Sequence, residues 1–480
     1  MLKFTKIGAT IGPACADPAI LEKMVKAGMN FARLNFAHGT YEWYEKTIKD
    51  LRKISLDTKE PLPILQDLQG PRIRIGAMPE KGVEIKEGTS VTLDTKVNTY
   101  ANKDLPVDHP DLHRFVNAGE RVLIDDGRIE LKIDKVVDTK IIGTVVQGGI
   151  VKSHKGINLP DSLLGIPALS DKDREDLRFG VKNGVDFVGL SFVSTAKDIL
   201  DVRYLIKDYE KELKINRPYP IRIIAKIERH EAIKNIDSII ETADGIMVAR
   251  GDLGLELPAN EVPIIQKRII DIARQHAKPV IVATQLLDSM RESRRPTRAE
   301  VSDVANAVID HTDALLLTNE TAAGKYPVEV VKTMSEIIIT TETSHYDDVP
   351  LVFNQKIKNI SSEEAITELS RFLAEEVKAK MIVAASLTGE TGRLLSHVRP
   401  KLPIMVATNN EIVYRQLGLS WGVDPLILPN CRSVEELIER VIEYLKETKR
   451  GKKGDKMIVV GGEPFGQAGN VNLVEVREIK

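Results

Sequence analysis

Short apolar runs, rich in valine and isoleucine, recur along the first two thirds of the chain, and amphipathic stretches separate them. Within each run the apolar residues are largely consecutive instead of alternating with polar ones. Consecutive apolar positions are typical of parallel strands that are buried on both faces of a sheet. The runs lie at residues 3–11, 31–35, 63–67, 186–191, 221–227, 245–249, 279–284 and 314–318.

Helix signals lie between these runs. Asp17 and Pro18 precede one amphipathic stretch, Ser170 precedes another, and Gly184 ends the second. Aspartate and serine cap free N–H groups at a helix start, proline is tolerated in the first turn, and glycine favours a helix end. Eight buried strands that alternate with helices predict an α/β fold of the closed (β/α)8 type, a TIM barrel.

The interval between the third and fourth runs breaks this alternation. Residues 70–163 lack a long helical period and contain strand-like segments divided by glycine and aspartate turns. We expect them to form a small β-barrel domain that is inserted after strand three and acts as a lid. The flanking segments, residues 1–69 and 164–345, together approach the ~250 residues typical of a TIM barrel.

A third unit is expected from residue 346 to residue 480. Ser361 and Glu364 have the spacing of a capping box ahead of a helix, and Ser433 precedes another helical stretch. Helices that alternate with apolar strands predict a C-terminal open α/β domain, suited to regulation. Its strands are expected at residues 381–386, 403–408 and 457–462.

The composition is that of a folded protein with no specialised environment. The 480 residues are 42% hydrophobic and 29% charged, and 68 basic residues nearly balance 70 acidic ones. No overall field attracts nucleic acid or an anionic membrane, so any anion must bind at a local site. Two cysteines, Cys15 and Cys431, provide no disulfide framework. Without a signal peptide or a run of membrane-spanning length, we expect a cytoplasmic protein.

Charged side chains gather at the carboxyl ends of the predicted strands, where TIM barrels carry their active sites. Lys226 and Glu228 lie two residues apart on one strand and therefore point to the same face. Asp252 follows the next strand, so Glu228 and Asp252 could share Mg²⁺ or Mn²⁺, which prefer carboxylate, water and substrate oxygens. With Arg33 and Arg74, Lys226 would form a cationic clamp typical of phosphoryl transfer.

Other interpretations of these residues remain open. Taken singly, Lys226 and Glu228 could form a local ion pair, Arg33 a salt bridge at the barrel rim, and His38 a helix cap. An aldolase with Lys226 as a Schiff-base amine is a second enzyme class, although the nearby Glu228 disfavours an uncharged amine. A non-catalytic metabolite sensor is a third class, although it predicts a broken site. The consistent charge pattern over six strand ends favours catalysis.

Several segments match one known family in order and spacing. They are ATIGPAC at 9–15, GMNFARLNFAHG at 28–39, QDLQGPRIRIG at 66–76, HKGINLP at 154–160, AKIERHEAI at 225–233, IMVARGDLGLELP at 246–258, KPVIVATQLLDSM at 278–290, RRPTRAEVSDVANAV at 294–308 and TNETAAGKYP at 318–327. In these segments, and over nearly its whole length, the chain resembles pyruvate kinases. The resemblance implies a glycolytic enzyme that transfers a phosphoryl group from phosphoenolpyruvate to ADP and yields pyruvate and ATP.

The resemblance also implies a role for each site residue. Lys226 would contact the phosphoryl group during transfer, Arg33 would bind the phosphate of phosphoenolpyruvate, and Glu228 and Asp252 would hold Mg²⁺. Thr284 would stand near the enolate carbon that is protonated. The substrate carboxylate would be bound by the amides of Gly251 and Asp252 and by Thr284. The nucleotide side would be formed by His38, Arg74 and Lys155, of which Lys155 belongs to the inserted domain.

The chain departs from the family at a monovalent-cation site. Pyruvate kinases usually hold K⁺ with Asn, Ser, Asp and Thr residues, whereas the matching positions here are Asn35, Ala37, Asp67 and Leu68. Two hydroxyl ligands are therefore missing, and Arg72 stands where the family has glutamate. We predict activity that does not require K⁺, with the permanent charge of Arg72 as its substitute. The alternative is that Arg72 only pairs with a neighbour.

A loop of the C-terminal unit carries hydroxyl groups ahead of a helical stretch. In the family the matching loop binds phosphorylated sugar effectors, so an allosteric sugar phosphate or AMP is one expectation. Glu390 within the loop disfavours an anion, and a simple capping turn is the alternative. The resemblance further implies a homotetramer. The loop residues in question are Ser386, Thr388, Gly389 and Thr391.

Overall fold

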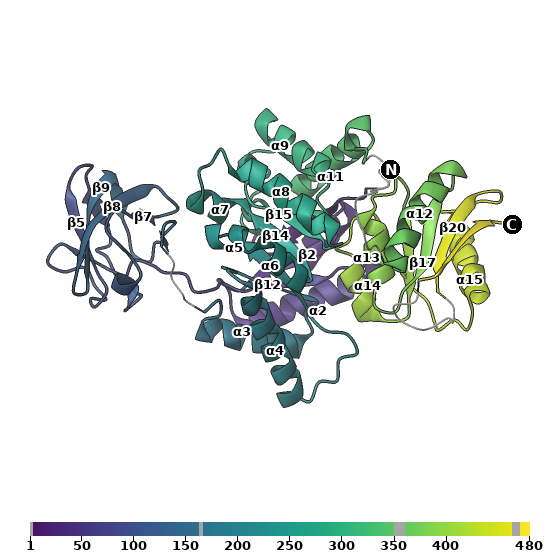
Figure 1. The fold of residues 1–480 in the computed structure, drawn as a ribbon, viewed down its shortest axis with the longest axis horizontal. Coiled ribbons are helices and arrows are strands. Elements are labelled where there is room, and N and C mark those ends of the chain that lie inside the picture. Colours follow the sequence, from purple (N-terminus) through teal and green to yellow (C-terminus); the bar gives the residue numbers. More distant parts are fainter. Residues whose placement is uncertain (1–2, 163–166, 350–360, 463–470) are drawn as a thin grey trace.

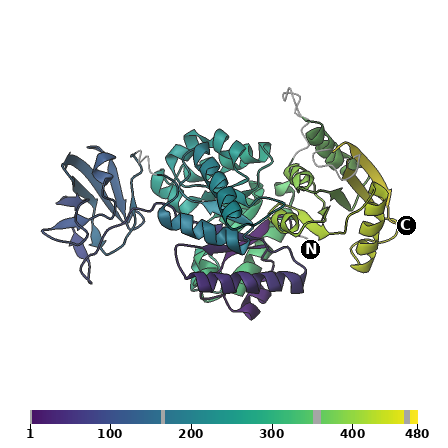
Figure 2. The same ribbon diagram turned by 90° about the horizontal axis from the view of Figure 1, so that it is seen from below.

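The computed structural model describes residues 3–162, 167–349, 361–462 and 471–480. Its three units lie in a row, with a mainly antiparallel β unit at one end, a barrel in the middle and a smaller α/β unit at the other end (Figures 1 and 2). The predicted boundary between residues 163 and 164 lies outside the described residues. The helices of the described ranges include none with the length and apolar character of a membrane span.

The central unit is a closed barrel of eight parallel strands, so the predicted fold class is confirmed. Each of the eight apolar runs contains one strand, and the first strand pairs with the last to close the barrel. The strands are β1 (Lys6–Thr10), β2 (Phe31–Asn35), β3 (Ile64–Asp67), β12 (Phe187–Leu190), β13 (Arg222–Ile227), β14 (Gly245–Ala249), β15 (Val280–Ala283) and β16 (Ala314–Leu317).

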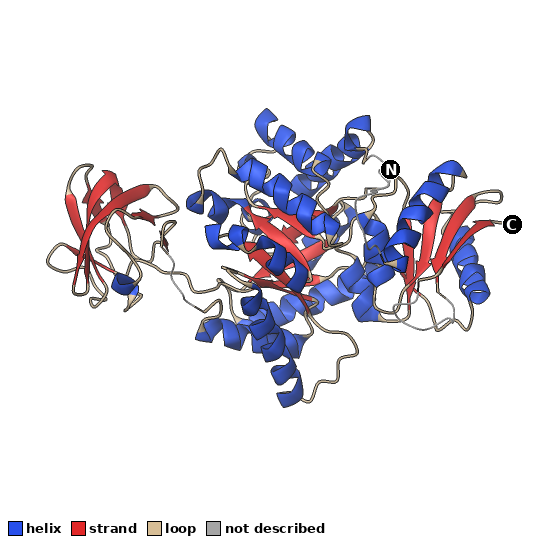
Figure 3. Cartoon of the chain, viewed as in Figure 1, coloured by secondary structure: helices blue, strands red, loops and turns tan. Residues whose placement is uncertain are grey.

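Helices surround the strands of the barrel (Figure 3). The predicted end signals lie where the sequence places them: Asp17 accepts a hydrogen bond from the Ala19 amide at 2.9 Å, and Ser170 forms a capping box with Asp173. Gly184 ends its helix in the left-handed conformation, with φ of 70°. The longer helices are α1 (Pro18–Lys26), α2 (Tyr41–Thr58), α3 (Asp171–Asn183), α4 (Ala196–Glu212), α8 (Val262–Gln275), α9 (Arg298–Ile309) and α11 (Pro327–Glu342).

The inserted unit differs in detail from the expected small β-barrel. Across residues 70–162 its strands form one six-stranded sheet and a separate antiparallel pair. The division lies at Gly148, after which the chain leaves the six-stranded sheet and pairs with residues 83–85. A Cβ atom at Gly148 would lie only 2.6 Å from the Ile85 carbonyl oxygen, so glycine permits this close approach. The sheet order is β11 (Ile157–Asn158), β7 (Arg121–Ile124), β8 (Ile129–Val137), β9 (Lys140–Gln147), β5 (Ser90–Asp94) and β6 (Asp104–Pro106), and the pair is β4 (Val83–Ile85) with β10 (Gly149–Val151).

The C-terminal unit is an open sheet in which only β21 runs antiparallel to its neighbour. Two strands escaped the sequence prediction. Pro425 interrupts the apolar pattern of β19, which is tolerated because β19 lies at an edge, and β21 alternates polar with apolar residues. The order is β19 (Val423–Ile427), β18 (Ile404–Thr408), β17 (Met381–Ala385), β20 (Lys456–Gly461) and β21 (Leu473–Glu478), with helices α12 (Ser362–Glu376), α13 (Glu390–His397), α14 (Glu411–Leu417) and α15 (Val434–Glu447).

The interior of the barrel changes from apolar to charged along the strands. Leu65 and Ile224 belong to an apolar cluster formed by inward-facing side chains. Two residues further along the same strands lie Asp67 and Lys226, which face the same way because strand side chains alternate with a period of two. The apolar part is completed by Leu419, which follows α14 and enters the cluster from the C-terminal unit. The carboxyl end of the barrel is therefore the polar mouth.

The substitution Leu419→Ala is expected to lower the thermal stability of the protein. Leu419 is 2% exposed, and truncation of a buried leucine typically costs about 2–5 kcal/mol. Scanning calorimetry should show a lower unfolding temperature for this variant. Leu56→Ala on α2 is the matched control, because Leu56 is 75% exposed and its loss should change stability by less than about 0.5 kcal/mol. Equal unfolding temperatures for L419A and the wild type would contradict the packing described above.

Candidate active site

Lys226 holds its ammonium group among oxygen atoms at the mouth of the barrel. Its Nζ donates to Ser191 Oγ at 2.7 Å and lies 2.8 Å from Glu228 Oε1 and 3.2 Å from Asp67 Oδ1. These neighbours come from three different strand ends, those of β12, β13 and β3. Lys226 itself is buried, with 8% of its surface exposed. The ammonium group is therefore fixed in position by its surroundings and not by its own flexible stem.

Asp67 is the carboxylate that two cations share. Its Oδ2 accepts from Arg33 Nε at 2.7 Å, while its Oδ1 faces Lys226. Arg33 also donates from Nη1 to Thr10 Oγ1 at 2.9 Å. Charge-assisted hydrogen bonds of this kind are short and directional, so the guanidinium and ammonium groups are held side by side. The mouth thus presents two positive groups whose separation is set by one buried carboxylate.

These contacts shift the pKa values of the cluster in opposite directions. Burial alone would raise the pKa of Asp67, but Lys226 and Arg33 outweigh it and hold that pKa below its usual range. Burial alone would lower the pKa of Lys226, but Asp67 and Glu228 raise it above its usual value. Burial raises the pKa of Glu228, Lys226 opposes this, and the neighbouring Asp252 adds to it. Asp67 and Lys226 therefore stay charged at neutral pH.

Glu228 and Asp252 fit a hard divalent cation. Glu228 accepts from the Phe192 amide at 2.9 Å and lies beside Lys226, whereas the Asp252 carboxylate makes no hydrogen bond or ion pair with any described residue. The charge of Asp252 helps to raise the pKa of Glu228, and a cation between the two would relieve this repulsion. In the described ranges, no group of three or more His, Cys, Asp or Glu side chains could enclose a metal. Two carboxylates leave room for water and substrate oxygens, as Mg²⁺ prefers.

Thr284 directly follows β15 and adopts an unusual backbone conformation. Its φ is 70° and that of Gln285 is 53°, values that side-chain-bearing residues adopt at a cost of about 1–3 kcal/mol each. The Thr284 Oγ1 accepts from the Gly251 amide at 2.8 Å, which joins this turn to the start of α7 (Arg250–Glu256). Since the hydroxyl oxygen accepts that bond, its own proton is available to a ligand.

Comparison with known proteins assigns this arrangement to a family. Residues 2–331 match the family profile described as "Pyruvate kinase, barrel domain", and residues 364–477 match "Pyruvate kinase, alpha/beta domain". The chain belongs to the pyruvate kinase family. The resemblance identified in the sequence is thereby confirmed, and the chain is a phosphotransferase.

Individual relatives align over the entire chain. It is 40% identical to the pyruvate kinase of Geobacillus stearothermophilus over 485 residues, an alignment that covers 100% of this chain and 81% of that protein. It is 41% identical to the pyruvate kinase of Mycobacterium tuberculosis over 479 residues, which covers 100% of this chain and 99% of that one. The crystal structure of a pyruvate kinase from Cryptosporidium parvum matches with a TM-score of 0.92 at 33% identity and covers 100% and 96% of the two chains.

Among the described residues, those predicted for the nucleotide side form no hydrogen bond or ion pair with Lys226. His38 is exposed, and its amide donates to the Asn35 carbonyl at 3.3 Å. Arg74 donates from Nη1 to the His154 carbonyl at 3.3 Å. Lys155 pairs with Asp125 Oδ1 at 2.7 Å. The side-chain bonds of Arg74 and Lys155 therefore stay within the inserted unit, and their nucleotide role remains a prediction.

The predicted substitute for K⁺ has a partner in the inserted unit. Arg72 donates to Asp126 Oδ1 at 3.0 Å and is one third exposed. Among the described residues it forms no hydrogen bond or ion pair with Asn35 or Asp67. Leu68 is buried and, like Ala37, offers no hydroxyl group. The loss of two K⁺ ligands and the independence from K⁺ both remain predictions.

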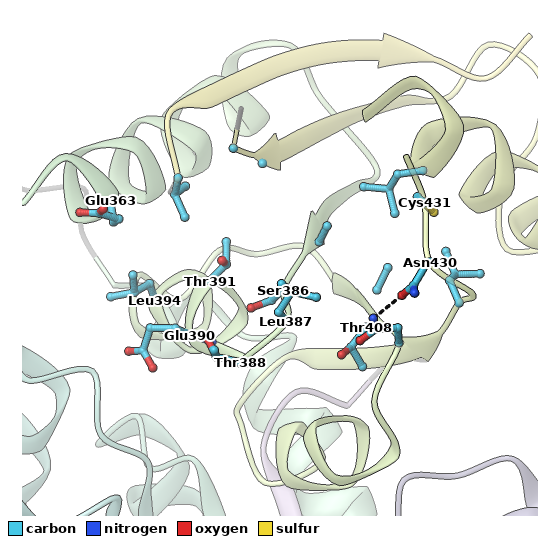
Figure 4. Close-up of a pocket in the computed structure, with 18 of the residues that line it drawn as sticks. Glu363, Ser386, Leu387, Thr388, Glu390, Thr391, Leu394, Thr408, Asn430 and Cys431 are labelled. Atoms are coloured by element: carbon cyan, nitrogen blue, oxygen red, sulfur yellow. Dashed lines mark hydrogen bonds between the residues drawn. The ribbon is translucent and has the colours of Figure 1, made fainter. Parts of the chain in front are cut away.

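The predicted effector loop borders a cavity of about 460 Å³ in the C-terminal unit (Figure 4). Ser386, Thr388 and Thr391 line it, and Gly389 begins α13 with φ of 81°. No lysine or arginine is among the described residues that line the cavity, and Glu390 pairs with Arg393 at 2.6 Å. Hydroxyl groups alone give little attraction for a multiply charged ligand. Binding of a phosphorylated effector remains a prediction.

Several site residues were not found from the sequence. Thr10, Ser191 and Phe192 each bind a predicted site residue, yet none forms part of a charged strand-end pattern. The period of two could have indicated Thr10 and Ser191, because each shares the inward parity of its strand. No local signal could have indicated the Phe192 amide, since that contact depends on how the loop after β12 folds.

Lys226 is expected not to form a Schiff base with pyruvate. Such a bond requires an uncharged amine, and the raised pKa keeps Lys226 protonated between about pH 6 and pH 9. After incubation with pyruvate and borohydride, intact-protein mass spectrometry should show the unmodified mass. A Schiff-base aldolase treated in parallel serves as the positive control. A stable adduct on Lys226 would favour the aldolase interpretation instead.

Proposed function

We propose that this protein transfers the phosphoryl group of phosphoenolpyruvate to ADP, forming pyruvate and ATP, and that it uses Mg²⁺ or Mn²⁺. The observation that carries the proposal is the fixed pair of Arg33 and Lys226 on Asp67, beside the free carboxylate of Asp252. Both substrates are anionic, so the first task of the site is to bring two negative groups together. Arg33 and Lys226 place positive charge where the two anionic substrates would repel each other most.

Arg33 and Lys226 are proposed to contribute to catalysis through the places at which they hold positive charge. When a phosphoryl group passes directly between two bound substrates, the protein forms no covalent bond to it, and charge stabilisation with alignment supplies most of the acceleration. Arg33 is suited to bind the phosphate by its planar fork of N–H donors, and Lys226 to follow the phosphoryl group as charge spreads over its oxygens. A divalent ion on Glu228 and Asp252 would supply further charge neutralisation when bound.

Thr284 and Gly251 are suited to the other end of the substrate. The Gly251 amide donates to Thr284 Oγ1 at 2.8 Å and so holds the hydroxyl in place, with the Thr284 proton left to be donated to a small carboxylate. The Thr284 proton is also available to a water molecule that protonates the enolate carbon. We propose that Thr284 orients this proton transfer.

The inserted unit is proposed to close over the site as a lid. It carries Arg74 and Lys155, and Lys155 is held by Asp125 within the unit. Nucleotide phosphates would compete with that carboxylate for Lys155 as the lid closes. The glycolytic role, the homotetramer, the cytoplasmic location and the division at residues 1–69, 70–163, 164–345 and 346–480 stay predictions of the sequence.

A coupled assay of pyruvate formation tests the proposal. The wild type should convert phosphoenolpyruvate and ADP to pyruvate with added Mg²⁺ and lose this activity with EDTA. Lys226→Met should lower kcat by about 10²–10³-fold, the usual loss when one group that stabilises a transition state is removed. Lys197→Met is the matched control, because the Lys197 side chain is 82% exposed on α4. Full activity of K226M would disprove the assigned role of Lys226.

Independence from K⁺ is tested in buffer balanced with tetramethylammonium. The wild type should keep most of its activity there, because two hydroxyl ligands for K⁺ are absent and Arg72 supplies a permanent charge. Arg72→Gln should then lose activity without K⁺, and added K⁺ should restore part of it. Asp126→Asn removes only the partner of Arg72 and should behave like the wild type. Loss of most wild-type activity without K⁺ would refute the prediction.

A further inference from the structure

Arg250 connects the ends of two barrel strands through its side chain. Arg250 directly follows β14, and its guanidinium is only 11% exposed. Its Nη2 donates to the carbonyl oxygens of Thr284 at 2.9 Å and Gln285 at 3.0 Å, and its Nε lies 3.3 Å from the first of these. The same guanidinium forms a two-pronged ion pair with Asp303 of α9, at 2.8 and 2.7 Å. One side chain thus joins α7, α9 and the turn after β15.

Thr284 and Gln285, whose carbonyl groups Arg250 binds, both have a left-handed backbone conformation. Thr284 is β-branched, and such residues seldom adopt a positive φ unless tertiary contacts impose it. Glu320 and Glu300 also bind this turn, but only further along the chain. Glu320 accepts from the Leu287 amide at 3.2 Å, and Glu300 accepts from the Ser289 amide at 2.7 Å. Among the described side chains, Arg250 is the one that donates to the carbonyl of Thr284.

We propose that Arg250 is a positioning residue for phosphoryl transfer, which holds Thr284 in its left-handed conformation so that the Thr284 hydroxyl meets the Gly251 amide. The inference rests on the proposed function of this site. Arg250, Gly251 and Asp252 are consecutive, so the residue that fixes the turn is continuous with the backbone that carries the Gly251 amide and the Asp252 carboxylate. A shift in Arg250 would therefore misalign the Thr284 hydroxyl, which its bonds to the turn hold in place.

The geometry requires arginine at this position. Its fork of N–H donors engages both oxygens of Asp303 through Nη1 and Nη2, while Nη2 also lies within hydrogen-bonding distance of two successive carbonyl groups. A lysine ammonium has three protons on a single nitrogen and could not pair with both oxygens of Asp303 and still reach both carbonyl groups. Asp303 is positioned to keep the guanidinium from rotating away from the turn.

Steady-state kinetics of Arg250→Gln and Arg250→Lys test the inference. Arg250→Gln should lower kcat by about 100-fold, the size of loss that follows a small misplacement of reacting groups, and should leave KM for ADP within twofold. Arg250→Lys should fall between this variant and the wild type. Binding of Mn²⁺, followed by electron paramagnetic resonance, should stay within twofold, because Glu228 and Asp252 are retained. Arg178→Gln, which breaks an exposed ion pair between α3 and α4, is the control.

Two further variants separate positioning from general damage. The double variant Arg250→Gln/Asp303→Asn removes the unpaired carboxylate, and the loss in kcat should persist. Recovery to wild-type kcat in that variant would mean that the unpaired Asp303 carboxylate had caused the loss, and would overturn the inference.

If Arg250→Gln fails to fold, the inference is tested with Asp303→Asn and Arg250→Lys instead. Each of these two variants is expected to have a kcat at least fivefold lower than that of the wild type. A kcat within threefold of the wild type for both would also overturn it. A wild type without pyruvate formation would instead refute the proposed function.

Discussion

The buried carboxylate of Asp67 is the group on which the rest of the site depends. Arg33 and Lys226 both bind it, and two like charges could not stay side by side in a barrel mouth without a negative group between them. The two cations are in turn the groups that can meet an anionic substrate. Asp67 also ends the third strand, directly before the chain leaves for the inserted unit. The site therefore lies directly beside the point at which the inserted unit is attached.

The charged mouth is possible because the lower part of the barrel is apolar and closed. Leu65 and Ile224 pack inside it, and Leu419 enters the same cluster from the C-terminal unit. This packing leaves the strand ends little freedom, so charged side chains project from a rigid support. The C-terminal unit thus contributes a side chain to the barrel core itself.

Backbone strain and side-chain contacts are coupled at the turn after β15. Thr284 and Gln285 would relax to ordinary conformations in isolation, and the hydrogen bonds from Arg250 oppose that relaxation. The same turn presents the Thr284 hydroxyl to the Gly251 amide. Favourable contacts elsewhere in the barrel therefore offset the cost of a strained backbone at the mouth. Precise geometry at this place has the greatest effect on the reaction rate.

The sequence alone determined the elements whose signals are local. Eight apolar runs became the eight barrel strands, and Ser170 capped its predicted helix, because burial pattern and capping act over a few residues. The edge strand with Pro425 was missed, since its stability comes from its neighbour and not from its own pattern. The division of the inserted unit into two sheets depended on a close approach at Gly148 that periodicity does not reveal.

The tertiary structure decided which charged groups meet. The sequence indicated Lys226, Glu228 and Asp252 as residues of one barrel mouth, because strand parity and strand order place them there. It gave no sign that Arg72 would bind Asp126 or that Arg250 would bind the turn at Thr284. Those partners are 54 and 34 residues apart along the chain, so only the fold of the inserted unit and the pairing of β14 with β15 bring them within hydrogen-bonding distance.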